Sequence, residues 1–192
     1  MPPTSGAGSV VVTTPSDREI RMTRDFDAPA RLVFAAWTTP ELLLCWFGAR
    51  GWRLVECEVD LRVGGAWRFV SRGPGGAEMT QHGVYREIVA GRRLVQTESY
   101  GDAPAGAETL VTTEFVEDQG RTTVVTTVTA PSREARDAVL RTPMERGVGE
   151  GHDRLARVLT EIRAYGVDGR RRAADPTDAS GTTELRRERR NG

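Results

Sequence analysis

The chain contains only two histidines, which are the first residues to consider for acid–base or metal chemistry. Imidazole is the side chain whose ordinary pKa lies closest to neutral pH, so it often carries protons in enzymes. His82 directly precedes Gly83 and equally fits a hydrogen-bonded structural role. His152 follows Val148 by four residues and precedes Leu155 by three, which places it on the apolar stripe of an expected helix. We interpret it as a hydrogen-bonded core histidine or a ligand contact, ahead of a catalytic group.

The other reactive side chains form no catalytic or metal-binding pattern. The sequence has no nucleophile elbow, no His/Cys cluster at metal spacing and no clear acid–base pair. Cys45 and Cys57 are too few for a disulfide framework, and we interpret them as reduced thiols. The glycine-rich run at 73–76 fits a hairpin loop, because nothing places it between a strand and a helix as phosphate binding requires. We therefore expect no metal, no cofactor and no catalytic residue, although the sequence leaves open whether the protein is an enzyme.

Two polar residues, Gln96 and Glu98, share one face of a strand-like segment with Leu94 and Tyr100. Two orientations are open for this face. If it is turned inward, the two polar groups can orient a ligand in the interior. If it is turned outward, they are ordinary solvated residues, which is the commoner situation for such side chains.

Composition narrows the classes of partner. Lysine and arginine together number 27, as do aspartate and glutamate, so the formal net charge is zero. A neutral balance gives no electrostatic reason to expect nucleic acid or an anionic membrane as partner. No stretch approaches the ~20 apolar residues of a membrane helix, and residues 1–15 lack the basic and apolar regions of a secretory signal. These features predict a cytoplasmic protein of unknown oligomeric state.

The chain of 192 residues fits one domain between two tails. Residues 1–17 are rich in Pro, Gly, Ser and Thr and are expected to form a flexible leader. Residues 18–166 form the expected domain. Residues 167–192 mix many arginines with acidic residues and predict a disordered charged tail, with a basic arm for RNA or a protein as the alternative.

The domain pattern is mostly strands followed by one long helix. A strand at 19–26 is followed by a short helix with Asp27 as N-cap and by a second short helix that begins near Thr39. The later strands are expected at 52–60, 66–72, 78–89, 93–100, 109–117 and 121–130. Thr142 to Glu145 fits a capping box for the long helix, which is expected to end at Gly166 after a short helical approach at 133–142. Its apolar stripe comprises Met144, Val148, Leu155, Leu159 and Ile162.

Eight short motifs occur in register with this order of elements. They are Phe26–Pro29, Ala36–Glu41, Trp46–Gly48, Asp60–Gly65, Gly83–Ile88, Arg93–Val95, Met144–Gly147 and Asp153–Leu155. With these motifs, residues 19–165 resemble the START-like (SRPBCC) superfamily, and within it the activator of Hsp90 ATPase homologue 1-like family. The resemblance implies an α+β helix-grip fold of the Bet v 1/START-like kind. In that fold a curved antiparallel sheet of about six to seven strands surrounds a long C-terminal helix, with two short helices after the first strand.

The resemblance also implies a cavity between the sheet and the long helix. Nine residues are candidates to line it, namely Phe34, Trp37, Trp46, Trp67, Phe69, Tyr85, Phe115, Val148 and His152. Phe47 is a further aromatic candidate. The alternative is that these side chains simply pack the core, because aromatic residues dominate cores as well as pockets.

Three functions are compatible with this resemblance. The first is non-catalytic binding of a small hydrophobic or aromatic molecule in the cavity. The second is a cochaperone-like module that binds a protein client, in keeping with a role in stress response. The third is a polyketide cyclase/dehydratase-like enzyme, which needs paired polar groups inside the cavity.

Three glycines, Gly147, Gly149 and Gly151, lie within the first turns of the long helix. Each costs about 1 kcal/mol relative to alanine in a helix interior, so their presence calls for a compensating gain. The missing side chains either enlarge the cavity or allow close packing of the helix backbone.

Overall fold

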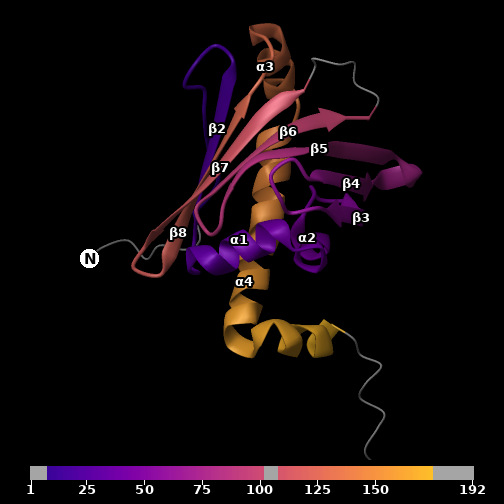
Figure 1. Ribbon diagram of the computed structural model, residues 1–192. Helices are drawn as coiled ribbons and strands as arrows, with labels where there is room; N and C mark the ends of the chain where they lie inside the picture. The colour runs from indigo at the N-terminus through magenta and orange to yellow at the C-terminus, as the bar shows by residue number, and fades with distance from the viewer. Residues whose placement is uncertain (1–7, 102–107, 175–192) are drawn as a thin grey trace, which may run out of the picture. The chain divides into compact units, whose positions relative to one another are not determined.

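The computed structural model describes residues 8–101 and 108–174, with only the backbone described for 167–174. Within these residues, eight strands form one antiparallel sheet, and four α-helices and a 3-10 turn at Pro74–Gly76 accompany it (Figure 1). The strands are β1 (Val11–Thr13), β2 (Glu19–Phe26), β3 (Arg53–Val59), β4 (Ala66–Arg72), β5 (Glu78–Val89), β6 (Arg93–Tyr100), β7 (Thr109–Asp118) and β8 (Arg121–Thr129). The helices are α1 (Ala30–Thr38), α2 (Pro40–Trp46), α3 (Arg133–Leu140) and α4 (Met144–Ala174). The chain divides into two compact units after Thr160, and the first unit holds the whole sheet.

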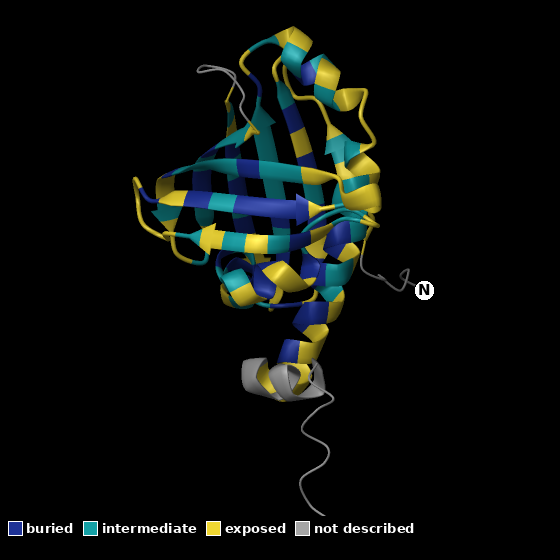
Figure 2. Ribbon diagram, turned by 90° about the vertical axis from the view of Figure 1, so that its right-hand side faces the viewer, coloured by how far each residue is buried: buried dark blue, intermediate teal, exposed yellow. Residues whose placement is uncertain are grey.

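The sheet follows the order β1-β2-β8-β7-β6-β5-β4-β3. Strands β3 to β8 form a meander, because each short turn returns the chain beside the strand before it. Strand β2 then pairs with β8 over its full length, from Glu19 opposite Thr129 to Phe26 opposite Thr122. Buried and exposed residues alternate along many of the strands (Figure 2), as expected when one face of a sheet is covered. This confirms the helix-grip architecture, with more strands than expected.

The additional strand is β1, which lies within the expected flexible leader at 1–17. Val11, Val12 and Thr13 pair with Thr23, Met22 and Arg21 of β2. Val10 is buried and packs in a hydrophobic cluster with Ile20 and Met22. The expectation of a flexible leader at 1–17 was therefore wrong for residues 10–13, while residues 1–7 lie outside the described residues.

The two short helices follow β2 as expected, but the first begins later than predicted. Its N-cap position is Pro29, two residues after the predicted Asp27. Pro40 starts α2, where its missing N–H costs nothing and its fixed φ suits the first turn. The Trp46 indole N–H of α2 donates to the Ala36 carbonyl of α1 over 2.9 Å, which ties the two helices together.

The long helix also begins one residue later than the capping box predicts. The Thr142 hydroxyl donates to the Val139 carbonyl at 2.7 Å, so Thr142 satisfies the end of α3 instead of capping α4. Ser132 provides the side-chain cap of α3 by accepting from the Ala135 N–H. Gly166, with φ of 72°, breaks α4 at the expected place, although helix continues beyond the break to Ala174. Of the predicted tail, residues 175–192 lie outside the described residues.

Within the described part of the chain, no helix is both long enough and apolar enough to cross a membrane.

Candidate functional site

The covered side of the sheet, here called the inner face, is identified by pairing across the strands. Phe69 lies opposite Gln81, and Gln81 lies opposite Tyr100. Directly paired residues point to the same face of an antiparallel sheet, so these three side chains share one side. The Phe69 ring contacts that of Phe47, directly after α2, with centroids 5.1 Å apart, which shows that this is the side covered by helices. Gln96, Glu98 and Tyr100 alternate along β6 and therefore lie on this side of the sheet, where Gln96 and Glu98 are half-buried and Tyr100, at the end of the strand, is 49% exposed. The outward orientation of Gln96 and Glu98, which the sequence favoured, was therefore wrong.

Rings from the helices and the sheet meet on the inner face in a continuous group, here called the aromatic cluster. Trp37 lies at its centre, with ring centroids 4.8 Å from Trp46 and 5.7 Å from Phe115. The group extends from Phe34 at one end to Trp67 at the other. Its members are Phe26, Phe34, Trp37, Trp46, Phe47, Trp67, Phe69, Phe115 and His152.

The aromatic cluster contains seven of the nine residues predicted to line a cavity. Tyr85 is buried and lies opposite Gln96 on the inner face, outside the ring contacts described above. Val148 packs instead against the cluster of Val10, Ile20 and Met22 beside β1. Phe26 was missed, because the sequence showed it only as the last residue of a strand. Met22, Arg24 and Phe26 are all buried and follow one another at intervals of two residues. This alternation identifies Phe26 as an inward-facing residue of the strand.

His152 enters the aromatic cluster from α4. Its ring centroid lies 5.6 Å from that of Phe26 and 5.5 Å from that of Trp37, and Nδ1 has no hydrogen-bond partner among the described residues. Burial lowers the pKa of His152 to about 3, with a further contribution from the nearby charge of Arg24 and opposition from Asp153. The imidazole is therefore neutral at pH 7 and offers a hydrogen-bonding nitrogen rather than a proton carrier.

A second polar group lies beside the aromatic cluster on the inner face. The Tyr100 hydroxyl donates to Glu98 Oε1 over 2.8 Å and accepts from Gln81 Nε2 over 3.2 Å. We call these three residues the polar triad. Gln81 is buried, and its Oε1 atom has no hydrogen-bond partner among the described residues. Gln96, which the sequence linked with Glu98, is two residues away on the same face.

A glycine allows the Trp67 indole to reach this region. A Cβ built on Gly83 would lie 1.8 Å from the Thr97 carbonyl oxygen and 2.8 Å from Trp67 Nε1. The indole is almost completely buried, yet its N–H has no partner among the described residues. Gly83 is thus required by close approach of its neighbours, and the indole N–H is a donor available to a further group.

Arg24 also projects from the inner face, toward α4. One guanidinium nitrogen lies 2.8 Å from Asp153 Oδ1 and 3.4 Å from the Gly149 carbonyl oxygen. The side chain is buried, whereas that of Asp153 is exposed. This pair fixes the first half of α4 against β2.

The start of α4 packs closely on the segment that follows α2. A Cβ on Gly151 would lie 3.2 Å from the Gly48 carbonyl oxygen, and one on Gly147 would lie 3.2 Å from Ala49 Cβ. Arg154 donates to the Trp46 carbonyl at 3.1 Å and also to that of Gly48. These contacts favour close packing as the reason for Gly151, while a Cβ on Gly149 would meet nothing within 4 Å.

The remaining reactive residues have structural surroundings. Burial, reinforced by Glu41 and Glu58, raises the pKa of Cys57 to about 12, so the thiol is protonated at neutral pH. His82 Nε2 lies 3.2 Å from the Gly101 carbonyl oxygen. The described residues contain no group of three or more His, Cys, Asp or Glu side chains arranged to hold a metal ion.

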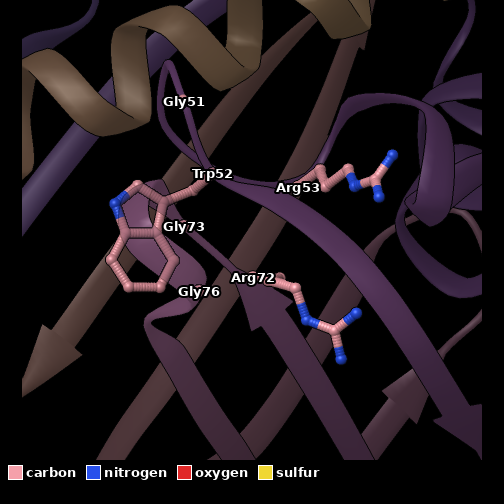
Figure 3. Close-up of a pocket in the computed structure, with 6 residues that line it drawn as sticks. All are labelled: Gly51, Trp52, Arg53, Arg72, Gly73 and Gly76. Atoms are coloured by element: carbon pink, nitrogen blue, oxygen red, sulfur yellow. The ribbon is translucent and has the colours of Figure 1, made fainter.

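A separate hollow lies at the ends of β3 and β4 (Figure 3). Its volume is about 430 Å³, and its lining comprises Gly51, Trp52, Arg53, Arg72, Gly73 and Gly76. Arg53 and Arg72 are exposed and occupy paired positions on the two strands. The Arg72 Nη2 atom lies 3.5 Å from Glu78 Oε2, so this arginine has an acidic partner. The hollow contains none of the nine predicted lining residues.

Comparison with known families agrees with the fold. A sequence model of the activator of Hsp90 ATPase homologue 1-like family matches residues 27–160. The chain belongs to this family. No significant match was found among curated proteins.

Solved structures of bacterial proteins resemble this family member over most of its length. A protein from Rhodobacter sphaeroides shares 31% identity, with a TM-score of 0.75 over 80% of this chain and 99% of the other. A protein from Arthrobacter aurescens shares 25% identity, with a TM-score of 0.72 over 80% and 93% of the two chains. A third, from Nitrosomonas europaea, shares 24% identity, with a TM-score of 0.71 over 79% and 100%.

Proposed function

We propose that this family member binds a small apolar or aromatic molecule, without catalysis, on the inner face between the sheet and α4. The observation that carries the proposal is a set of buried polar atoms beside the aromatic cluster. Trp67 Nε1, Gln81 Oε1 and His152 Nδ1 all lack partners among the described residues. Interiors that pack only against themselves satisfy nearly all such atoms. A ligand with a few polar groups supplies what these three atoms need.

Partial burial on the inner face also supports binding. Trp37 touches four rings of the aromatic cluster and is still only half-buried. Gln96 and Glu98 are likewise half-buried, although they face the helices. Aromatic surface with a few polar groups is typical of small-molecule sites.

The electrostatics of His152 and Cys57 argue against acid–base catalysis by these two residues. His152 remains neutral down to a pH of about 3, and Cys57 remains protonated up to about 12, so neither exchanges protons near neutral pH. We place this binding role in the cytoplasm, in keeping with the neutral charge balance.

A blocking substitution tests the proposal. Gln96→Trp adds bulk to the inner face beside Tyr85 and Val111, whereas Thr112→Trp adds the same bulk to the opposite face of neighbouring β7. With the uncharged N-phenyl-1-naphthylamine as fluorescent probe, we expect Gln96→Trp to weaken binding at least about tenfold, a change of about 1.4 kcal/mol. Thr112→Trp is expected to leave the probe affinity unchanged.

Two results overturn the proposal. One is a folded wild-type protein that does not bind the probe. The other is an equal loss of affinity in both variants, which shows that the probe binds elsewhere. Native mass spectrometry of the protein purified from its own host gives an independent measurement, because a retained small molecule adds its mass to that of the chain.

A further inference from the structure

The hydrogen bonds of the polar triad run in one direction. When Glu98 is ionised its carboxylate only accepts, so the single hydroxyl hydrogen of Tyr100 points to Glu98 Oε1 over 2.8 Å. The Tyr100 oxygen must then accept from the amide nitrogen of Gln81, over 3.2 Å. This arrangement leaves acceptors at both ends, namely Gln81 Oε1 and the second carboxylate oxygen of Glu98. The triad is therefore complementary to a hydrogen-bond donor.

When Glu98 is ionised, no described residue compensates its charge. Glu98 forms no ion pair with any described residue, whereas Arg24, the buried arginine of the inner face, is paired with Asp153. Removal of the Glu98 carboxylate from water raises its pKa, and the hydrogen bond from Tyr100 opposes this shift. A cation placed beside the carboxylate favours its charged form and offsets the cost of burial.

An apolar surface adjoins the triad. Gln81 lies opposite Phe69, whose ring contacts both Phe47 and Trp67 of the aromatic cluster. A ligand held at the triad by one end therefore reaches aromatic rings with the rest of its structure.

We propose that the polar triad binds the protonated amino group of a small aromatic or apolar amine whose hydrocarbon part lies on the aromatic cluster. This inference rests on the proposed function and assigns the charge and the orientation of the ligand. The ammonium group donates to Glu98 and to Gln81 Oε1, and Tyr100 holds the carboxylate in place. Hydrogen bonds between ammonium and carboxylate are roughly twice as strong as neutral ones, which makes charge the main determinant of selectivity.

Three matched naphthalene probes test the inference by isothermal titration calorimetry at pH 7. They are 1-naphthylmethylamine, 1-naphthalenemethanol and 1-naphthoate, which share the ring and differ in the charge of the substituent. We expect the amine to bind at least about tenfold more tightly than the alcohol, and the carboxylate to bind most weakly.

Substitutions in the polar triad show which residues cause the preference for the amine. Glu98→Gln removes the charge at nearly constant shape and is expected to abolish the preference for the amine while alcohol binding is kept. Tyr100→Phe removes the positioning hydroxyl and is expected to reduce the preference several-fold. Glu114→Gln is the matched control, because Glu114 is a carboxylate of β7 on the opposite face, near Arg93.

The outcomes separate this inference from the proposed function. Equal binding of amine and alcohol to the wild-type protein overturns the amine assignment and leaves inner-face binding intact. Binding of none of the three probes overturns both. An unchanged preference in Glu98→Gln, or an equal loss in Glu114→Gln, also overturns the assignment. If Glu98→Gln fails to fold, the probe series on the wild-type protein and on Tyr100→Phe decides the matter.

Discussion

His152 combines two properties that are seldom found together, a central position among aromatic rings and a ring nitrogen without a partner. Its neighbours Phe26, Trp37 and Trp46 exclude water, and the adjacent charge of Arg24 further disfavours protonation. The unfolded chain has no such environment, so its histidine takes up a proton near the ordinary pKa of 6.5. The folded state and the unfolded state therefore differ in bound protons over a wide range of pH.

This difference predicts a pH-dependent stability. The pKa is lowered on folding, so the stability that depends on neutral His152 is fully present above pH 6.5 and is lost as the pH falls toward 3. From pH 7.5 to 5.0 this residue should lower the free energy of unfolding by about 2 kcal/mol, at about 1.4 kcal/mol per pH unit below 6.5. Urea denaturation of the wild type and of His152→Phe measures the difference. Parallel pH profiles for the two proteins would contradict the assignment.

At the residue scale, the sequence identified which side chains share a face but not which face is inside. The alternation of Gln96, Glu98 and Tyr100 along β6 is a local property and could be predicted. Their inward orientation depends on pairing with β5, and the contact of Tyr100 with Gln81 joins positions 19 residues apart. The register of two strands, with its irregularity near Tyr85, creates the polar triad, and no local pattern contains that information.

Two of the glycines of α4, Gly149 and Gly151, differ in what surrounds them, although the sequence presents them as equivalent. Gly149→Ala should raise the free energy of unfolding by about 1 kcal/mol, because alanine favours the helix and its Cβ meets no atom within 4 Å. Gly151→Ala should bring no such gain, because its Cβ would lie 3.2 Å from the Gly48 carbonyl oxygen, which also accepts from Arg154. Chemical denaturation of both variants under one set of conditions tests the contrast. If Gly151→Ala is stabilised as much as Gly149→Ala, the close approach at Gly48 is not a constraint.

The elements whose ends are marked by glycine-rich turns in the sequence were those whose bounds were predicted closely. Strands β4, β5 and β6 have the expected bounds, since turns rich in glycine separate them. The start of α4 was misplaced because a threonine hydroxyl can serve either of two adjacent helix ends. Thr142 serves α3 through the Val139 carbonyl, a choice set by how tightly the two helices follow one another. Strand β1 was missed because three residues are too few to show an alternation.

At the scale of the whole molecule, β1 joins part of the N-terminal segment to the sheet, so this part is expected to contribute to stability. Removal of residues 1–8 should leave stability unchanged, whereas removal of residues 1–14 deletes β1 and exposes Ile20 and Met22. Burial of Val10 alone corresponds to about 2 kcal/mol, so the longer deletion should cost at least that much. Thermal and urea unfolding of the two truncated proteins provides the measurement, and Val10→Ser in the full chain should reproduce part of the loss. Equal stability of the two truncated proteins would mean that β1 is dispensable.

The order of the strands leaves β1 and β3 as the two edges of the sheet. Unpaired edges are templates on which a second chain can add a strand, the step that begins fibril growth. The β1 edge is only three residues long, and the β3 edge carries exposed charges at Arg53, Glu56 and Glu58. A short strand offers few backbone hydrogen bonds to an incoming chain, and charged side chains must lose water when one docks. The folded protein is therefore protected at both edges against amyloid-like polymerisation.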